Sequence, residues 1–151
     1  MVSQRTFASG FGVIFALLVV VRAMPEFKPQ QLTVSVENHD ELEDFKSNHK
    51  THIAIFYGYW CGDSQRNFGL LDTLAKLSLE KGFPVIKGDV GTIDEYRNIM
   101  NFLRKDSLYQ VRHIPKVMVI SDGRVVISKE DQDFYNSDNV DDIKKEIQKG
   151  A

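Results

Sequence analysis

A lone cysteine is the residue in this sequence best suited to chemistry. Cys61 stands in the segment Gly58-Tyr59-Trp60-Cys61-Gly62-Asp63-Ser64, between an apolar run and a long helical pattern. This position places the thiol at the first turn of a helix, where unpaired backbone N–H groups and the helix dipole stabilise negative charge. The thiolate is the form that attacks disulfides. We therefore expect a reactive thiol, moderated by the carboxylate of Asp63, which disfavours a second negative charge nearby.

Ser64 restricts what this thiol can do. In a pair of cysteines at this spacing, the first forms a mixed disulfide with a client and the second releases it. The chain has a single cysteine, so Ser64 is a degenerate resolving position. Three alternatives follow. Cys61 exchanges disulfides by a monothiol route that an external thiol such as glutathione completes, it retains clients or a second copy of the chain in a lasting disulfide, or it is an inert relic.

The elements that must position Cys61 alternate between strands and helices. Strands are expected over 32–36, 53–57, 83–90 and 124–128, and the segment 111–120, which contains Pro115, leads into another strand. Helical patterns follow Asp40, run from the cysteine segment to Gly82, cover Asp94 to Arg104, and follow a cap at Ser137 or Asp138. This alternation predicts an α/β fold with a central mixed sheet flanked by helices, because strand–helix–strand units form parallel sheets. Asp122-Gly123 predicts a hairpin that adds an antiparallel edge.

The N-terminal segment has the pattern of a secretory signal peptide. Arg5 precedes an apolar run from Phe11 to Val21, and Val21-Arg22-Ala23 places small residues at the cleavage positions. The run is shorter than the roughly 20 residues that a membrane-spanning helix needs, although an uncleaved anchor is the alternative. Lys149-Gly150-Ala151 is not a retention signal of the Lys-Asp-Glu-Leu type, so we expect secretion.

The composition is that of one soluble globular domain. The 151 residues are 42% hydrophobic and 26% charged, with a formal net charge of −2 at pH 7 and no cluster of basic residues. These values give no electrostatic basis for binding nucleic acid. We expect a signal peptide over 1–23, an extended leader over 24–31 and one domain over 32–151.

Other polar residues carry weaker signals. His49 and His52 lie three residues apart at a predicted turn, but no cysteine or acid completes a tetrahedral set, so we expect no metal site. His113 either tunes Cys61 or is a solvated loop residue. Lys116 either pairs with the thiolate or faces solvent from its strand.

Three matches make the chain resemble the thioredoxin-related family of thioredoxin domain-containing protein 17. Trp60, Cys61 and Asp63 match its Trp-Cys-x-Asp-Cys motif, while Gly62 stands where a proline is usual. Ile114-Pro115 resembles the pair whose proline is cis and faces the active-site cysteine. The third match consists of Val90-Gly91, Tyr96, Asn101 and Arg104.

The resemblance covers about residues 34 to 149. It implies the thioredoxin fold, a protein-disulfide reductase activity, and a client-binding surface around Cys61 formed by Trp60, Gly62, Ile114 and Pro115. It also implies clients that carry thiols or disulfides. From the signal-like segment we expect no membrane association after cleavage, and from the monothiol route no cofactor beyond glutathione as a co-substrate.

The chain departs from the family pattern at several positions. Besides Ser64, Ile55 replaces a buried aspartate that helps to deprotonate the second cysteine in thioredoxins. Gly69 stands where a proline commonly kinks the long helix, so that helix is expected to be straighter or softer. A further alternative is the cluster ligation of monothiol glutaredoxins, which share Cys-Gly-x-Ser. Asp63 replaces the aromatic residue usual there, so we rank this alternative last.

Overall fold

A computed structural model describes residues 31–35 and 39–150, with side chains from residue 39 onward. The predicted signal peptide and all but the last residue of the predicted leader lie outside the described residues. The described part contains the elements that surround Cys61.

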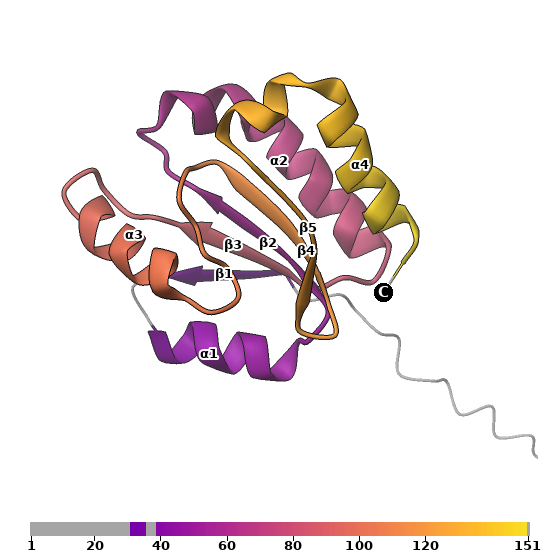
Figure 1. The fold of residues 1–151 in the computed structure, drawn as a ribbon, viewed down its shortest axis with the longest axis horizontal. Coiled ribbons are helices and arrows are strands. Elements are labelled where there is room, and N and C mark those ends of the chain that lie inside the picture. Colours follow the sequence, from indigo (N-terminus) through magenta and orange to yellow (C-terminus); the bar gives the residue numbers. More distant parts are fainter. Residues whose placement is uncertain (1–30, 36–38, 151) are drawn as a thin grey trace, which may run out of the picture.

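The described strands form one five-stranded sheet in the order β1-β3-β2-β4-β5 (Figure 1). The strands are β1 (Gln31–Ser35), β2 (His52–Tyr57), β3 (Val85–Asp89), β4 (Lys116–Ser121) and β5 (Arg124–Glu130). β3 runs parallel to both β1 and β2, whereas β4 is antiparallel to β2 and to β5. The predicted α/β class with a mixed central sheet is therefore confirmed.

Helices cover both faces of this sheet. The helical elements are α1 (His39–Asn48), α2 (Gly62–Glu80), α3 (Tyr96–Lys105), the short 3₁₀ helix η1 (Asp131–Tyr135) and α4 (Ser137–Gln148). Figure 1 shows α2 and α4 side by side on one face, with α1 and α3 on the other. None of the described helices is both long enough and apolar enough to cross a membrane.

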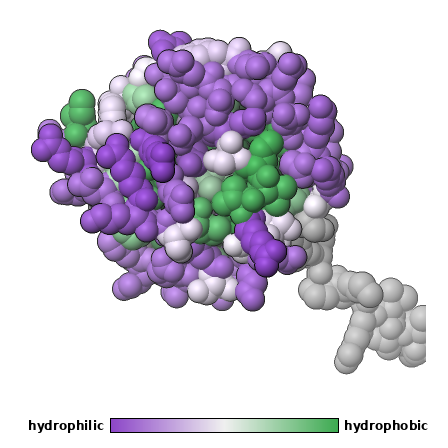
Figure 2. All heavy atoms as spheres, in the orientation of Figure 1, coloured by the Kyte–Doolittle hydropathy of each residue, from purple (hydrophilic) through white to green (hydrophobic). Residues whose placement is uncertain are grey.

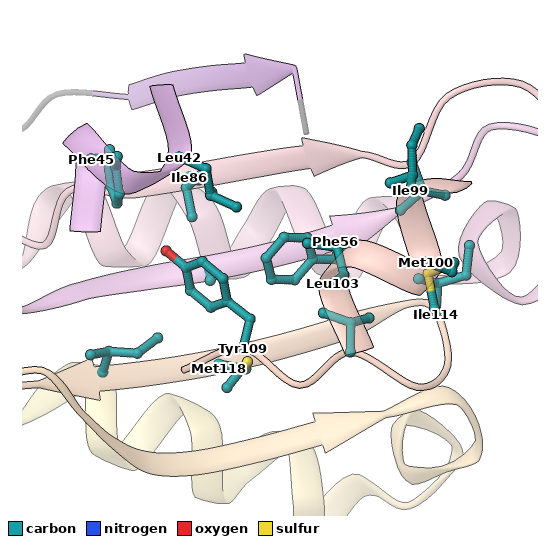
Figure 3. Packing of buried hydrophobic residues seen from close by; sticks show 14 residues of the cluster. Leu42, Phe45, Phe56, Ile86, Ile99, Met100, Leu103, Tyr109, Ile114 and Met118 are labelled. Carbon is teal, nitrogen blue, oxygen red and sulfur yellow. The ribbon is translucent and has the colours of Figure 1, made fainter. Parts of the chain in front are cut away.

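The core is divided by the sheet into two clusters. All six residues of β2 are buried, as expected for a strand covered on both faces. Because side chains alternate along a strand, Ala54 and Phe56 join the first cluster, with α1 and α3. Ile53 and Ile55 join the second, with α2 and α4. Figure 3 shows Phe56 beside Tyr109 in the first cluster, their ring centroids 5.1 Å apart.

The predicted hairpin between β4 and β5 is confirmed. Asp122 and Gly123 form its two-residue loop with φ angles of +50° and +72°, the left-handed pair that suits a tight hairpin. Val125 and Val126 on β5 are exposed, and Figure 2 shows an apolar patch on this part of the surface.

Several elements differ in detail from the sequence predictions; β3, for example, was expected over 83–90 and spans Val85–Asp89. β4 begins at Lys116, after a loop over residues 111–115. η1 was not predicted. The cap of α4 is Asn136, not Ser137 or Asp138: its Oδ1 accepts a hydrogen bond of 3.0 Å from the backbone N–H of Asp138.

Candidate thiol site

Cys61 is the N-cap of α2 and lies where two loops meet. Its backbone is extended (φ −79°, ψ 119°), and its carbonyl accepts from the N–H of Gln65, at 2.9 Å, in the first turn of the helix. The side chain is partly exposed and packs against the first core cluster. Its thiol donates to the carbonyl oxygen of Ile114, 3.8 Å away. The structure therefore brings together the two predicted segments, which lie 53 residues apart in sequence.

The loop that carries Ile114 is fixed at both ends. The Ile114–Pro115 peptide bond is cis, and both residues are buried. The N–H of Val111 donates to the carbonyl of Leu103 at 3.1 Å, and the N–H of Asp131 donates to the carbonyl of Pro115 at 2.8 Å. These contacts hold the Ile114 carbonyl in a set position against the Cys61 sulfur.

Ser64 is buried, and its hydroxyl is engaged. Its Oγ accepts a hydrogen bond of 3.3 Å from the backbone N–H of Gly58. Gly58 leaves little room for a side chain, because an added Cβ would meet Ile114 at 3.1 Å and Val90 at 3.2 Å. The residue at the degenerate resolving position thus secures the turn that leads to Cys61, a role that the motif alone did not indicate.

Trp60 is held by two contacts. Its indole N–H donates to the carbonyl of Gly91 at 2.9 Å, and its ring packs edge-to-face on Tyr96 with centroids 4.8 Å apart. Gly91 has a φ of +73°, and a Cβ there would come within 2.8 Å of the Glu95 carboxylate. Trp60 therefore covers the first core cluster and stays partly exposed, directly before Cys61 in the chain. Gly62 is exposed as the first residue of α2.

The negative charge of Asp63 is compensated by hydrogen bonds from two side chains, Arg66 and Tyr135, which were not predicted. The guanidinium of Arg66 and the hydroxyl of Tyr135 both donate to Asp63 Oδ1, and Arg66 Nε donates to the Tyr135 oxygen at 3.1 Å. The hydrogen bond from Tyr135, followed by that from Arg66, lowers the pKa of the Asp63 carboxyl. Arg66 lies one helical turn from Asp63, a spacing that could have revealed it. Tyr135 is 72 residues away and carried no signal.

Lys116 follows neither prediction. Its side chain is buried, and its ammonium donates to the Gln110 carbonyl at 3.1 Å and lies 3.2 Å from Glu130 Oε2. It therefore pairs with Glu130 rather than facing solvent. His113 is exposed, as a loop histidine, and its Nδ1 lies 3.3 Å from Glu130 Oε1. Burial alone would raise the pKa of Glu130, but His113 and Lys116 together lower it.

The histidine pair has a structural role. His52 is fully buried; its Nδ1 lies 2.6 Å from the His49 carbonyl, and its Nε2 lies 3.0 Å from the Tyr109 hydroxyl. The ring therefore donates from Nδ1 and accepts at Nε2, and burial lowers its pKa to about 4. In the described part of the chain, no group of three or more His, Cys, Asp or Glu side chains could hold a metal ion.

Comparison with solved structures identifies the fold. A mutant thioredoxin from Halobacterium salinarum is 25% identical, covers 82% of this chain and 91% of its own, and has a TM-score of 0.50. Plasmodium falciparum thioredoxin is 21% identical over 81% and 99% of the two chains, with a TM-score of 0.52. Thioredoxin F from spinach chloroplast is 15% identical over 83% and 99%, with a TM-score of 0.53.

No family model matches the chain, and no curated protein sequence matches it significantly. The similarity to these solved structures shows that the chain has the thioredoxin fold. Its single thiol lies at the start of α2.

Proposed function

We propose that this protein exchanges thiols and disulfides through Cys61 by a monothiol route. The observation that carries the proposal is the placement of the partly exposed sulfur at the helix start, 3.8 Å from the Ile114 carbonyl, in a thioredoxin fold. A helix N-terminus favours the thiolate, which is the attacking species. The resemblance to the family of thioredoxin domain-containing protein 17 supports the same reading.

The reaction proceeds in three displacements. The Cys61 thiolate attacks one sulfur of a client disulfide, so a Cys61–client disulfide forms and the other client sulfur leaves as a thiolate, which takes a proton from water. An external thiolate of the glutathione type then attacks the Cys61 sulfur and releases the client thiolate. A second external thiolate attacks the resulting mixed disulfide at the external sulfur, which regenerates Cys61 and yields the oxidised external disulfide.

Ser64 explains why an external thiol is needed. A buried hydroxyl that accepts from the Gly58 N–H is no substitute for a resolving thiolate, because an alcohol remains protonated and does not attack disulfides. Clients would meet the protein at the partly exposed Trp60 and at Gly62. Ile114 and Pro115 are buried and would form the floor of that surface.

We further propose that the clients are disulfide-bearing proteins of the secretory pathway or the extracellular space, with glutathione as co-substrate. The signal-like segment over 1–23 supports this location.

The test measures both capture and turnover with a disulfide-containing peptide. In the absence of glutathione, the wild-type protein should form a mixed disulfide visible by intact mass, and Cys61→Ala should form none. With glutathione, the wild-type protein should catalyse peptide reduction. Ser64→Cys should also catalyse peptide reduction without glutathione, as long as a reducing system restores its two thiols. The second thiol of this variant releases the peptide from the mixed disulfide internally. If wild-type and Cys61→Ala react at the same rate, the proposal is wrong.

Retention of clients is the second candidate function. It is favoured by the engaged hydroxyl of Ser64, because a mixed disulfide at Cys61 then has no route of release within the chain. Rapid capture without turnover at millimolar glutathione would support retention over catalysis.

A further inference from the structure

A cavity of about 150 Å³ lies between α2 and β3, near the carboxyl end of β2. Its walls are mostly apolar. They are formed by Ile55, Tyr57, Tyr59, Phe68, Leu71, Asp72 and Lys87. The cavity lies on the α2 face of the sheet, whereas Cys61 and Trp60 pack against the cluster on the opposite face. It is therefore separate from the thiol site, although Tyr59 stands two residues before Cys61.

Three aromatic rings form one side of this cavity. Tyr57 is perpendicular to Tyr59, with centroids 5.3 Å apart, and perpendicular to Phe68, with centroids 5.8 Å apart. Tyr59 and Phe68 complete the set at 5.4 Å and 61°. Such edge-to-face sets offer ring faces and edges to one more aromatic ring, an arrangement that is more favourable than burial of the same area alone. Tyr59 lies 62% exposed, so an occupant would cover apolar surface that is now in water.

The size of the cavity matches one six-membered ring. An apolar cavity of about 150 Å³ binds benzene in another protein.

The rim of the cavity supplies polar groups. Lys87 Nζ lies 2.7 Å from Asp72 Oδ1, and the Asp72 side chain is more exposed than that of Lys87. Lys87 lowers the pKa of Asp72, so its carboxylate is a charged acceptor near neutral pH. A carboxylate at the mouth of an aromatic cavity suits a ring that carries one hydrogen-bond donor, since hydrogen bonds to charged groups are the stronger kind.

We propose that this cavity is a binding site for a small free phenol, with its ring against Tyr57, Tyr59 and Phe68 and its hydroxyl donating to Asp72. The site is independent of the thiol chemistry.

Amide NMR of the protein tests this proposal, with phenol as the probe. Phenol should shift the amides of Tyr59, Leu71 and Lys87 saturably, with a dissociation constant on the order of 1 mM, as expected for so small a ligand. Cyclohexanol, which has the hydroxyl without the aromatic ring, and toluene, which has the ring without the hydroxyl, should each bind several-fold more weakly.

Variants separate the cavity from general surface binding. Tyr59→Ala should weaken phenol binding by about fivefold or more, since it removes one ring from an exposed position without disturbing the core. Asp72→Ala should reduce the preference for phenol over toluene. Tyr135→Phe, an exposed tyrosine outside the cavity, should leave binding unchanged. Non-saturable shifts, equal binding of cyclohexanol, or an unaltered affinity in Tyr59→Ala would overturn the assignment.

Discussion

At the scale of single residues, the charge next to Cys61 depends on partners of Asp63. Arg66 and Tyr135 both donate to its carboxylate, which places a compensated rather than an isolated negative charge near the helix start. The effect of Asp63 that the sequence analysis described is therefore moderated by side chains from α2 and η1.

Removing the contact from Arg66 to Asp63 should slow the reactions of the Cys61 thiol. Arg66→Gln should lower the rate of Cys61 alkylation near pH 7 by about twofold to threefold, since a less compensated carboxylate disfavours the thiolate. Asp63→Asn should raise the rate, and Arg66→Gln in the Asp63→Asn background should have little further effect. Alkylation rates with iodoacetamide across pH 6 to about 10 give the comparison. Equal effects of Arg66→Gln in both backgrounds would show that Arg66 acts on the thiol without Asp63.

Ser64 should contribute to stability independently of redox chemistry. Ser64→Ala leaves the buried N–H of Gly58 without its partner and should lower the free energy of unfolding by about 1–2 kcal/mol. Ser78→Ala is the matched control, because the buried Ser78 hydroxyl donates to the Leu74 carbonyl. Loss of this hydroxyl leaves no backbone N–H without a partner. Urea unfolding of both variants measures the difference. A smaller loss for Ser64→Ala than for Ser78→Ala would contradict the proposed role.

Single residues also mark the limit of sequence reasoning at this site. Cys61 and Ile114 were placed together by motif and fold, because each follows from its position in a known framework. The burial of Lys116 and its pairing with Glu130 could not be predicted, because a lysine in a strand gives no sign of which partner lies across the sheet.

At the scale of elements, α2 continues through Gly69 without interruption. Gly69 is exposed, its backbone is helical, and nothing lies within 4 Å of an added Cβ. The glycine is therefore a source of conformational freedom in the unfolded chain rather than a packing requirement.

Replacing Gly69 should stabilise the protein. Gly69→Ala should raise the free energy of unfolding by about 0.5–1 kcal/mol, since alanine is the better helix former. Gly82→Ala is the control with the opposite sign, because Gly82 has a φ of +87°, which alanine adopts only with strain. Thermal unfolding of the two variants checks both directions. No gain in Gly69→Ala would mean that α2 is strained at this position.

Elements with strong periodic patterns were predictable, and those set by long-range contacts were not. The continuous apolar run at β2, the α2 pattern and the Asp122-Gly123 loop each express one local rule, and each agrees with the structure. η1 was missed because only Phe134 among its residues is buried, which leaves no repeating pattern to detect. The residue at which β4 starts depends on packing of the preceding loop against α3 and η1, which no local pattern indicates.

At the scale of the whole molecule, stability should depend on pH through His52. Its pKa in the folded protein, about 4, lies below the ordinary value of 6.5. Between these values the unfolded chain binds a proton that the folded chain does not. Stability is therefore fully present above pH 6.5 and falls as the pH drops towards 4, by roughly 3 kcal/mol from this group.

Denaturant unfolding at pH 7, 5.5 and 4.5 measures this dependence. His52→Gln should be less stable at neutral pH but should lose much less stability on acidification. An unchanged slope in His52→Gln would assign the acid sensitivity to other groups.

The arrangement of the whole domain followed from the order of its elements, because strands alternating with helices leave few ways to cover both faces of a sheet. The division of the core into two clusters is a consequence of β2 being buried on both sides. The aromatic cavity beside α2 arises from how rings pack in space, and no sequence pattern indicates it.

The presence of Ser64 in place of a second cysteine also bears on how Cys61 is expected to respond to peroxide. Oxidation of a thiolate first gives a sulfenic acid, which a neighbouring thiol can convert to a disulfide. In this chain the residue one turn along α2 is a serine bound to backbone, and Cys61 is the single cysteine. A sulfenic acid at Cys61 therefore has no second thiol within this chain to condense with. We expect a further equivalent of peroxide to oxidise it irreversibly to sulfinic acid, unless a thiol of another molecule first forms a disulfide with it.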